Sequence, residues 1–379
     1  MKKIGIVCEY NPFHLGHLYQ INKIKQLYPD SLIIVIFPTT FTQRGEVSII
    51  SKWNKTSIAL ANKVDLVLEL PFVFATQSAD IFAKGALEIL NKMQIDTLVF
   101  GSESDDVTTL IELAKCQLYN KYYNLLVKDY LDQGLNYPTA LSQALQKLTA
   151  KKIDQPNDLL ALAYIKEIIK NDYPIVPISI KRTNDYHSQE IDSSIISASL
   201  IRKLYFEDQE ISDFVPLGID KYLEKVNNDN FWELLKYQII NNKNNLARFQ
   251  TVDEGIENRI IKYIDEVNSW HELVTKIKTK RYTYNKINRM LIHILTNFTK
   301  EEATDLKIDY LRVLGFSDKG KEHLNQIKKE INCPLITNYK KNISKILDIE
   351  FRVNEIYALK VNKDLIKEEY QHKPIIKNC

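Results

Sequence analysis

The chain has 379 residues, of which 45% are hydrophobic and 26% charged, and its formal net charge is +3. This length allows two or three domains, each with its own core, and the composition excludes a largely disordered chain. Every apolar run is shorter than the roughly 18 residues needed to cross a bilayer, and the first residues lack the features of a secretory signal. We therefore expect a cytoplasmic protein that makes no contact with a membrane.

The four cysteines are widely separated in the chain, at Cys8, Cys116, Cys333 and Cys379. No two of them form a CxxC pair, which argues against a zinc site and against a disulfide framework. We therefore expect neither redox chemistry nor a metal held by the protein.

Short apolar runs alternate with amphipathic segments through the first half of the chain. The runs predict strands over Ile4–Val7, Leu32–Phe37, Asp65–Leu70, Thr97–Phe100 and Ile175–Ile180. The segments between them predict helices around Leu15–Leu27, Lys52–Ala61, Ala79–Met93 and Leu159–Ile169. Continuous apolar strands separated by helices indicate an α/β fold with a Rossmann-like parallel sheet, covered on both faces. Such a sheet binds its ligand at the carboxyl ends of the strands, here near residues 8–17.

The pattern changes after about residue 205, where charged segments with helical spacing replace the apolar runs. This predicts a first domain over residues 1–205 and a mainly helical second domain over residues 206–379. Residues 103–150 are also largely helical, and we expect them to be inserted into the first domain or to extend it. The helices expected in the second domain are Asp220–Val226, Phe231–Asn241 and Glu257–Val267.

Two histidines lie where the first predicted strand turns into a helix, in the stretch EYNPFHLGHLYQI. A helix that opens at His14 places His14 and His17 on one face, because residues three apart are neighbours. The amino terminus of a helix attracts phosphate through its N–H groups and partial positive charge, and two imidazoles can donate further hydrogen bonds. Gly16 removes a side chain where a nucleotide would lie against the backbone.

Three interpretations of this histidine pair are open. A metal site could use two histidines one helical turn apart, but no acid or cysteine follows at ligand spacing. A structural pair would satisfy its ring nitrogens without a ligand. We favour phosphate handling, in which His14 and His17 stabilise charge on the α-phosphate of a nucleotide while an attacking oxygen displaces pyrophosphate.

A basic stripe, KIKTKRYTYNKINR over residues 276–289, contains six basic residues and no acid. It suits a phosphate backbone, with Tyr282 and Tyr284 placed to stack on bases. The alternative is a solvated helix face beside a loop.

The HLGH stretch after a strand resembles the HxGH signature of the nucleotidyltransferase superfamily. Further motifs make most of the chain similar to the bacterial tRNA(Met) cytidine acetate ligase family, which implies a nucleotidyltransferase sheet with a C-terminal mainly α-helical domain. Besides EYNPFHLGHLYQI (9–21), these motifs are FTQRGE (41–46), DLVLELP (65–71), QSADIFAKGA (77–86), FGSE (100–103), PNDLLALAYIK (156–166), IKRTNDYHS (180–188), EGIENRI (254–260) and VLGFSDKG (313–320).

The resemblance implies a ligase that activates acetate with ATP, releasing pyrophosphate, and then acetylates N4 of the wobble cytidine in elongator tRNA(Met). Mg²⁺ is expected to accompany the ATP. Basic residues of the second domain, including Lys280, Arg281 and Arg289, would contact the tRNA backbone. Two functions of other classes stay open, a small-molecule nucleotidyltransferase and a non-enzymatic nucleotide-binding regulator.

The same resemblance implies a catalytic pair, His14 and His17, and an ATP site around them. Three residues distant in sequence from this pair also have ordinary interpretations, a turn glycine at Gly101, a helix N-cap at Asn157 and a surface ion pair at Arg182. The residues expected to bind ATP are Val7, Cys8, Glu9, Tyr10, Asn11, Pro12, Phe13, His14, Leu15, Gly16, His17, Leu18, Tyr19, Gln20, Gly101, Asn157 and Arg182.

Two further motifs complete the expected site. SASLIR, residues 197–202, resembles the superfamily's second signature, in which Ser197, Ser199 and Arg202 would hold the β- and γ-phosphates; a capped helix start is the alternative. FTQRGE is expected to form an exposed loop over the site. Its candidates for substrate contact are Gln43, Arg44 and Glu46, and its flanks FPTT and EVS depart from the family pattern.

Overall fold

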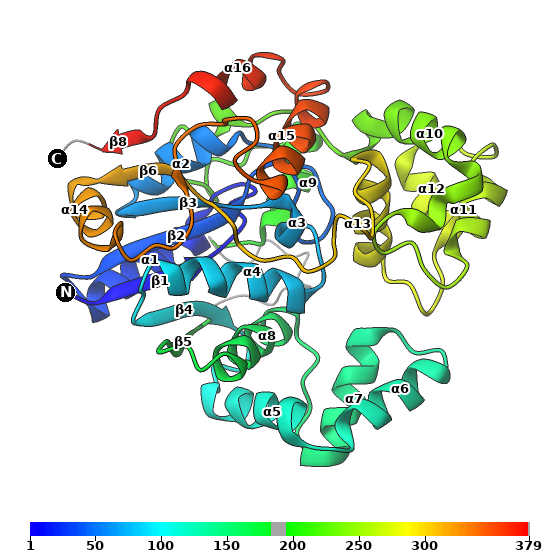
Figure 1. Cartoon of the computed structure of the whole chain (residues 1–379), viewed down its shortest axis with the longest axis horizontal. Helices are drawn as coiled ribbons and strands as arrows, with labels where there is room; N and C mark the ends of the chain where they lie inside the picture. The colour runs from blue at the N-terminus through cyan, green and yellow to red at the C-terminus, as the bar shows by residue number, and fades with distance from the viewer. Residues whose placement is uncertain (183–194, 378–379) are drawn as a thin grey trace.

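The apolar runs assemble into one sheet in the computed structural model, which describes residues 1–182 and 195–377 (Figure 1). Within these ranges the sheet has eight strands, of which seven form the order β5-β4-β1-β2-β3-β6-β7 and the eighth, β8, pairs with β6. The five predicted strands are confirmed and are mutually parallel. They are β1 (Lys3–Val7), β2 (Leu32–Pro38), β3 (Leu66–Leu70), β4 (Thr97–Ser102) and β5 (Val176–Lys181).

Strand β2 explains why the runs are continuously apolar. Its alternate side chains enter two cores, with Leu32, Ile34 and Ile36 on one side and Ile33 and Val35 on the other. Both faces of the sheet are therefore buried, and a polar residue on either face would lose its water. Helices α4 (Ala79–Lys92) and α8 (Pro156–Lys170) contribute to the first core, and α1 (Leu15–Leu27), α2 (Lys52–Ala61) and α9 (Ala198–Phe206) to the second.

Residues 103–150 hold three helices that follow β4 and precede α8. They are α5 (Val107–Tyr119), α6 (Tyr123–Asp132) and α7 (Tyr137–Thr149). Asn136 caps α7 through its side chain, and a proline in the first turn suits the fixed backbone there. Helices α6 and α7 pack on each other and project from the sheet at the bottom of Figure 1, so these two helices form a lobe, whereas α5 packs on α8.

A second helical cluster lies at the right of Figure 1. It contains α10 (Trp232–Asn241), α11 (Ile256–Tyr263), α12 (Trp270–Ile277) and α13 (Tyr284–Leu295), with 3₁₀ turns at Asn228–Phe231 and Lys243–Arg248. The helices expected near 231–241 and 257–267 are present. The helix expected over 220–226 is wrong, because only Asp220–Tyr222 is 3₁₀ and Leu223 is extended, with Glu224 N donating to Ile49 O.

The predicted extent of the helical domain, residues 206–379, is also wrong at its C-terminal end. After α13 the chain returns to the sheet, where β6 (Leu311–Ser317) pairs antiparallel with β3. Strands β7 (Leu335–Ile336) and β8 (Ile375–Lys377) then pair with β6. The remaining helices are the short α3 (Phe72–Ala75) after β3, and α14 (Asp318–Ile327), α15 (Lys345–Ala358) and α16 (Asp364–Gln371) in the returning segment.

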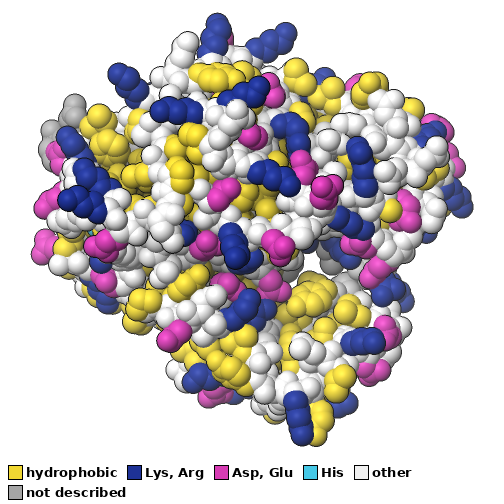
Figure 2. Space-filling view, viewed as in Figure 1, with side chains coloured by type: hydrophobic (Ala, Val, Ile, Leu, Met, Phe, Trp, Pro, Cys, Tyr) yellow, Lys and Arg dark blue, Asp and Glu magenta, His cyan; other side chains and the backbone are white. Residues whose placement is uncertain are grey.

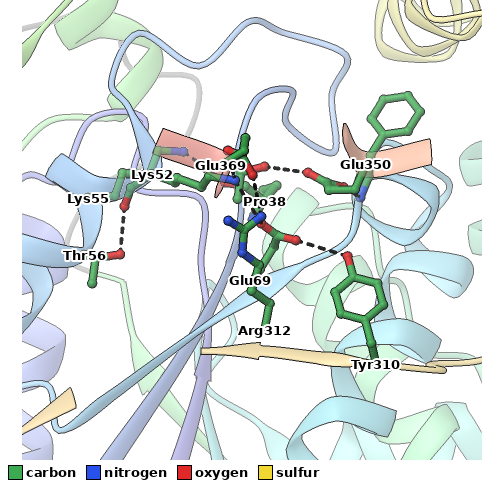
Figure 3. Close-up of polar contacts among 11 residues, drawn as sticks. Pro38, Lys52, Lys55, Thr56, Glu69, Tyr310, Arg312, Glu350 and Glu369 are labelled. Carbon is green, nitrogen blue, oxygen red and sulfur yellow. Dashed lines mark hydrogen bonds and ion pairs between the residues drawn. The ribbon is translucent and has the colours of Figure 1, made fainter. Parts of the chain in front are cut away.

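Buried ion pairs hold this returning segment to the sheet (Figure 3). Lys52 Nζ lies 3.2 Å from Glu69 and 2.5 Å from Glu369, and an Arg312 nitrogen lies 2.5 Å from Glu369 and 3.5 Å from Glu69. Tyr310 also donates to Glu69 at 3.1 Å. All four charged side chains are at most 6% exposed. Two buried cations thus neutralise two buried anions. Without its partners, a charge of either sign would be unstable in this low-dielectric interior.

We predict that Arg312→Met destabilises the fold by about 3–5 kcal/mol, because it leaves two buried carboxylates to share one lysine. Urea unfolding measures the change. As a control, Lys367→Met removes a cation whose pair with Asp364 is largely exposed, and it is expected to change stability by less than about 0.5 kcal/mol. Equal stability of Arg312→Met and the parent would contradict a structural role for this network.

Candidate active site

A cavity of about 820 Å³ opens at the carboxyl ends of β1, β4 and β5. The end of β1, the first turn of α1, the start of α9 and the loop of residues 41–47 all contribute to its wall. The α6–α7 lobe and α13 line it farther from the sheet. The hollow in the surface between the lobe at the bottom and the helical cluster at the right is visible in Figure 2. Its position is the one that a parallel sheet predicts for a ligand site.

His14 and His17 cap helix α1 by accepting backbone hydrogen bonds. Gly16 N donates to His14 Nδ1 at 3.0 Å, and His14 N donates to His17 Nδ1 at 3.2 Å. The helix therefore begins at Leu15, with His14 as its N-cap rather than its first residue. Since both Nδ1 atoms accept, a neutral ring carries its hydrogen on Nε2 and can donate from that atom.

The two rings are held neutral by their surroundings. Burial lowers the pKa of His14 to about 3, and the positive charges of Arg182 and Arg202 act in the same direction. The pKa of His17 lies well below its usual value because of burial, with His14 and Arg182 as further causes. The ring centroids are 3.8 Å apart, and both residues line the cavity. The site therefore presents two adjacent Nε2–H donors near two guanidinium groups.

Gly101 and Arg182 are packed together on neighbouring strand ends. A Cβ at Gly101 would lie 3.4 Å from Arg182 Cγ, an ordinary contact distance, so the Arg182 side chain lies against this part of β4. Gly101 lies within β4 instead of in a turn, which excludes the turn-glycine interpretation. Both residues line the cavity.

Asn157 is not the N-cap of α8, because Gln155 is the N-cap and Asn157 is the second residue of the helix. Glu103 of the FGSE motif accepts from the backbone N–H groups of this first turn. Asn157 Nδ2 donates to Glu103 Oε1 at 2.5 Å, and Asp158 N donates to Glu103 Oε2 at 3.0 Å. In return, the Asp158 carboxylate accepts from Ser102 Oγ at 2.5 Å. Sequence reasoning missed Glu103 and Asp158, although each lies in a motif that carried the resemblance. Their reciprocal bonds hold Asn157 beside the cavity.

Arg202 joins three parts of the site. Its guanidinium donates to Asn11 O at 2.7 Å, to Glu46 at 2.5 Å and to Ser199 Oγ at 3.3 Å. Ser197 is the N-cap of α9, and its hydroxyl accepts from Leu200 N, as the capping alternative expects. All three SASLIR candidates nevertheless line the cavity.

The FTQRGE loop is packed beneath α13, so the expectation of an exposed loop is wrong. Gln43 N donates to Glu9 at 2.7 Å, and an Arg289 nitrogen donates to Gln43 O at 3.2 Å. Gly45 has φ +74, and a Cβ there would lie 2.4 Å from Arg289 N. Any other residue at this position would strain the backbone and clash with α13, so only glycine fits. The loop therefore connects the cavity floor to α13, and burial raises the pKa of the Glu9 carboxyl beneath it.

Asn11 lies in the turn that follows β1, and its side chain also bonds to a second segment of the chain. Its Nδ2 donates to Val47 O at 3.1 Å, and its Oδ1 accepts from Ile49 N at 2.8 Å. The side chain thus fixes the end of β1 to the chain that leaves the FTQRGE loop.

Several expected residues lie away from the cavity. Of the expected ATP set, Pro12, Phe13, Leu15 and Leu18 are outside its described lining, and Phe13 packs against Tyr10 and His17 instead. The remaining members of the ATP set line it, and so do Gln43, Arg44 and Glu46. Residues 183–188 of the IKRTNDYHS motif fall outside the described ranges.

The basic stripe is divided between cavity and surface. Arg281 and Arg289 line the cavity, whereas Lys280 is exposed and outside the described lining. Arg281 pairs with Glu254 at 3.0 Å. Tyr282 is buried and donates to Asp253 O at 2.6 Å, so the expectation that it stacks on a base is wrong.

Residues 1–182 and 195–377 contain neither a metal-binding cluster nor a membrane-spanning helix. No group of three or more His, Cys, Asp or Glu side chains there could hold a metal ion. No helix in the same ranges has both the length and the apolar character of a membrane span.

Comparisons with known proteins agree on one family. The model of the HIGH nucleotidyl transferases matches residues 1–373. A tRNA(Met) cytidine acetate ligase from Geobacillus sp. is 35% identical over 400 residues, covering 99% of this chain and 100% of the relative. The ligase of the same name from Bacillus subtilis is 34% identical over 405 residues, covering 99% and 97%.

Solved structures share the whole fold. The apo crystal structure of Thermotoga maritima TmcAL has a TM-score of 0.90 and 28% identity, with 99% of each chain covered. The crystal structure of the same protein bound with alpha-thio ATP has a TM-score of 0.89 and 29% identity, again with 99% of each chain covered.

We predict that His14 stays neutral from pH 8 down to about pH 5 in the folded protein, because burial lowers its pKa from 6.5 to about 3. The unfolded chain binds this proton below pH 6.5, so the stability that His14 contributes falls progressively as pH drops from 6.5 toward 3. Histidine ring NMR signals, assigned with His14→Asn, measure the titration. A His14 midpoint near its ordinary pKa of 6.5 would contradict the buried, neutral ring.

Proposed function

The chain belongs to the tRNA(Met) cytidine acetate ligase family of the HIGH nucleotidyl transferases, and from this premise we propose how its residues carry out ATP-dependent acetate ligation. The observation that supports the proposal best is the pair of neutral imidazoles at the start of α1. Their Nδ1 atoms are committed to the backbone, and their Nε2–H groups are available to a ligand in the cavity.

In the first step, a carboxylate oxygen of acetate bonds to the α-phosphorus of ATP. The bond from that phosphorus to the pyrophosphate oxygen breaks, which leaves acetyl-adenylate and pyrophosphate. His14 and His17 donate hydrogen bonds to the α-phosphate oxygens as charge develops on them, and fixed donors of this kind need no reorganisation during the reaction. Arg202, Arg182 and Ser199 hold the leaving phosphates, since guanidinium groups match phosphate oxygens in pairs. Mg²⁺ bound to the nucleotide would neutralise charge on its phosphates, because this ion retains water and binds substrate phosphates.

In the second step, N4 of the wobble cytidine of elongator tRNA(Met) attacks the acetyl carbonyl. The bond between that carbonyl and the AMP oxygen breaks, so AMP leaves and the amine loses a proton. The base can reach the adenylate only if it leaves its stack in the anticodon loop. Lys280, Arg281 and Arg289 supply positive charge for the tRNA backbone.

We expect His14→Asn and His17→Gln each to lower acetate-dependent ATP–pyrophosphate exchange by about 10²–10³-fold, the usual cost of one transition-state donor. Asn at the N-cap and Gln at the third helical position keep the capping box while removing the rings. Exchange and thermal melting are measured together, with the exposed His271→Asn as control. Exchange at the parent rate in both variants would overturn the proposed roles, and exchange that ignores acetate would overturn the proposed substrate.

We expect Lys280→Gln combined with Arg281→Gln to weaken tRNA binding and to reduce its salt dependence. Each lost phosphate contact lowers the slope of log affinity against log salt by about 0.7–0.9. Removing Arg281 also leaves Glu254 to repel the phosphates. Binding is titrated at several salt concentrations, with the exposed Lys341→Gln as control. A parental slope in the double variant would assign these side chains to a solvated surface.

A further inference from the structure

The residues expected to bind ATP occupy only one end of the cavity. They come from β1, α1, the ends of β4 and β5, and the starts of α8 and α9. The other end is lined by the α6–α7 lobe on one side and by α13 on the other. This second compartment is lined by none of the residues expected to bind ATP.

The two walls of the second compartment differ in chemistry. The lobe presents apolar and aromatic side chains, which are Leu131, Leu135, Tyr137, Pro138 and Leu141. The facing wall presents three cations, which are Arg281, Lys286 and Arg289. A ligand that fits both walls needs a flat or apolar part and an anionic part.

The compartment has a continuous floor at the start of α4. On the lobe side, Tyr137 donates from its hydroxyl to Asp80 at 3.4 Å. On the opposite side, Gln43 Nε2 donates to Gln77 O at 2.9 Å, and Arg289 donates to Gln43 O at 3.2 Å. The apolar and basic walls are therefore joined through one helix turn and form two sides of a single cleft.

The basic wall carries three lining cations against one lining carboxylate, Glu254, which pairs with Arg281 at 3.0 Å. Burial lowers the pKa of Arg289 to about 10, and its described hydrogen bond goes to an uncharged carbonyl oxygen. Burial also lowers the pKa of Lys286, although Glu254 and Asp253 oppose this. A phosphate group beside these cations would supply hydrogen-bond acceptors and negative charge in place of the water that burial has removed.

We propose that the α6–α7 lobe is the base-binding wall of an RNA subsite, where unpaired nucleotides lie with their bases against Tyr137 and their phosphates toward α13. This proposal rests on the proposed function and identifies where the RNA substrate meets the cavity. Single-stranded RNA is recognised in this way elsewhere, with bases on aromatic side chains and the backbone along cations. A phosphorylated peptide would use the basic wall but has no reason to need the aromatic one.

The test compares Tyr137 with Tyr122, which is 54% exposed on the same lobe but outside the described cavity lining. The probe is a stem-loop RNA with the sequence of the tRNA(Met) anticodon arm, and the same stem without its loop is the reference. Tyr137→Ala is expected to weaken stem-loop binding at least tenfold with an unchanged salt slope, because stacking is not electrostatic. Tyr137→Phe and Tyr122→Ala are expected to bind like the parent.

A fluorescent cytidine analogue in the loop provides a second measurement that does not depend on affinity. Its emission is expected to be quenched on binding to the parent and restored in the complex of Tyr137→Ala. Parental affinity and parental quenching in Tyr137→Ala would overturn the assignment. Acetate-dependent ATP–pyrophosphate exchange by the parent is measured separately, so a failure of the ligase proposal is distinguished from a failure of this subsite.

Discussion

The first turn of α1 is the constraint on which the site depends. Two backbone N–H groups that a helix leaves unpaired are accepted by the Nδ1 atoms of His14 and His17. One pair of hydrogen bonds therefore begins the helix, orients both rings and leaves the proton of each neutral ring on Nε2. A charged imidazole could not accept at Nδ1, so the burial that lowers the pKa of His14 also protects the cap. Helix formation and the proposed phosphate binding use the same two side chains.

Helix α13 connects the α10–α13 cluster to this site through the FTQRGE loop. The loop receives a hydrogen bond from Arg289 and gives one to Glu9, and Gly45 allows the backbone of α13 to approach. One turn farther along α13, His293 lies with Nε2 2.8 Å from Thr76 O, next to the start of α4. The basic wall and the ATP end of the cavity are thus parts of one packed unit. RNA bound along α13, as proposed, would therefore lie on a wall that is packed against the proposed ATP end of the cavity.

Whether an element can be predicted from the sequence depends on how far apart in the chain the residues that stabilise it lie. Strands β1 to β5 are visible in the sequence because two covered faces demand uninterrupted apolar runs. Strand β6 is not visible in that way, since it carries Arg312, which is buried only because Glu69 and Glu369 approach from distant segments. The FTQRGE loop has the composition of a surface loop, and only the packing of α13 buries it. Asn157 is of a residue type that often caps helices, but it lies inside α8, and Glu103, which follows β4, accepts from the first turn of that helix.

The sequence by itself determined the parallel sheet, the strand-to-helix position of the histidine pair and the family resemblance, because local periodicity and motif spacing carry that information. The tertiary structure decided which ring nitrogens are free to donate, where the C-terminal segment returns to the sheet and which cations face the cavity. These features depend on contacts between residues tens to hundreds of positions apart, such as Tyr137 with Asp80 and Arg289 with Gln43. Such contacts are made in three dimensions, and residue spacing along the chain does not record them.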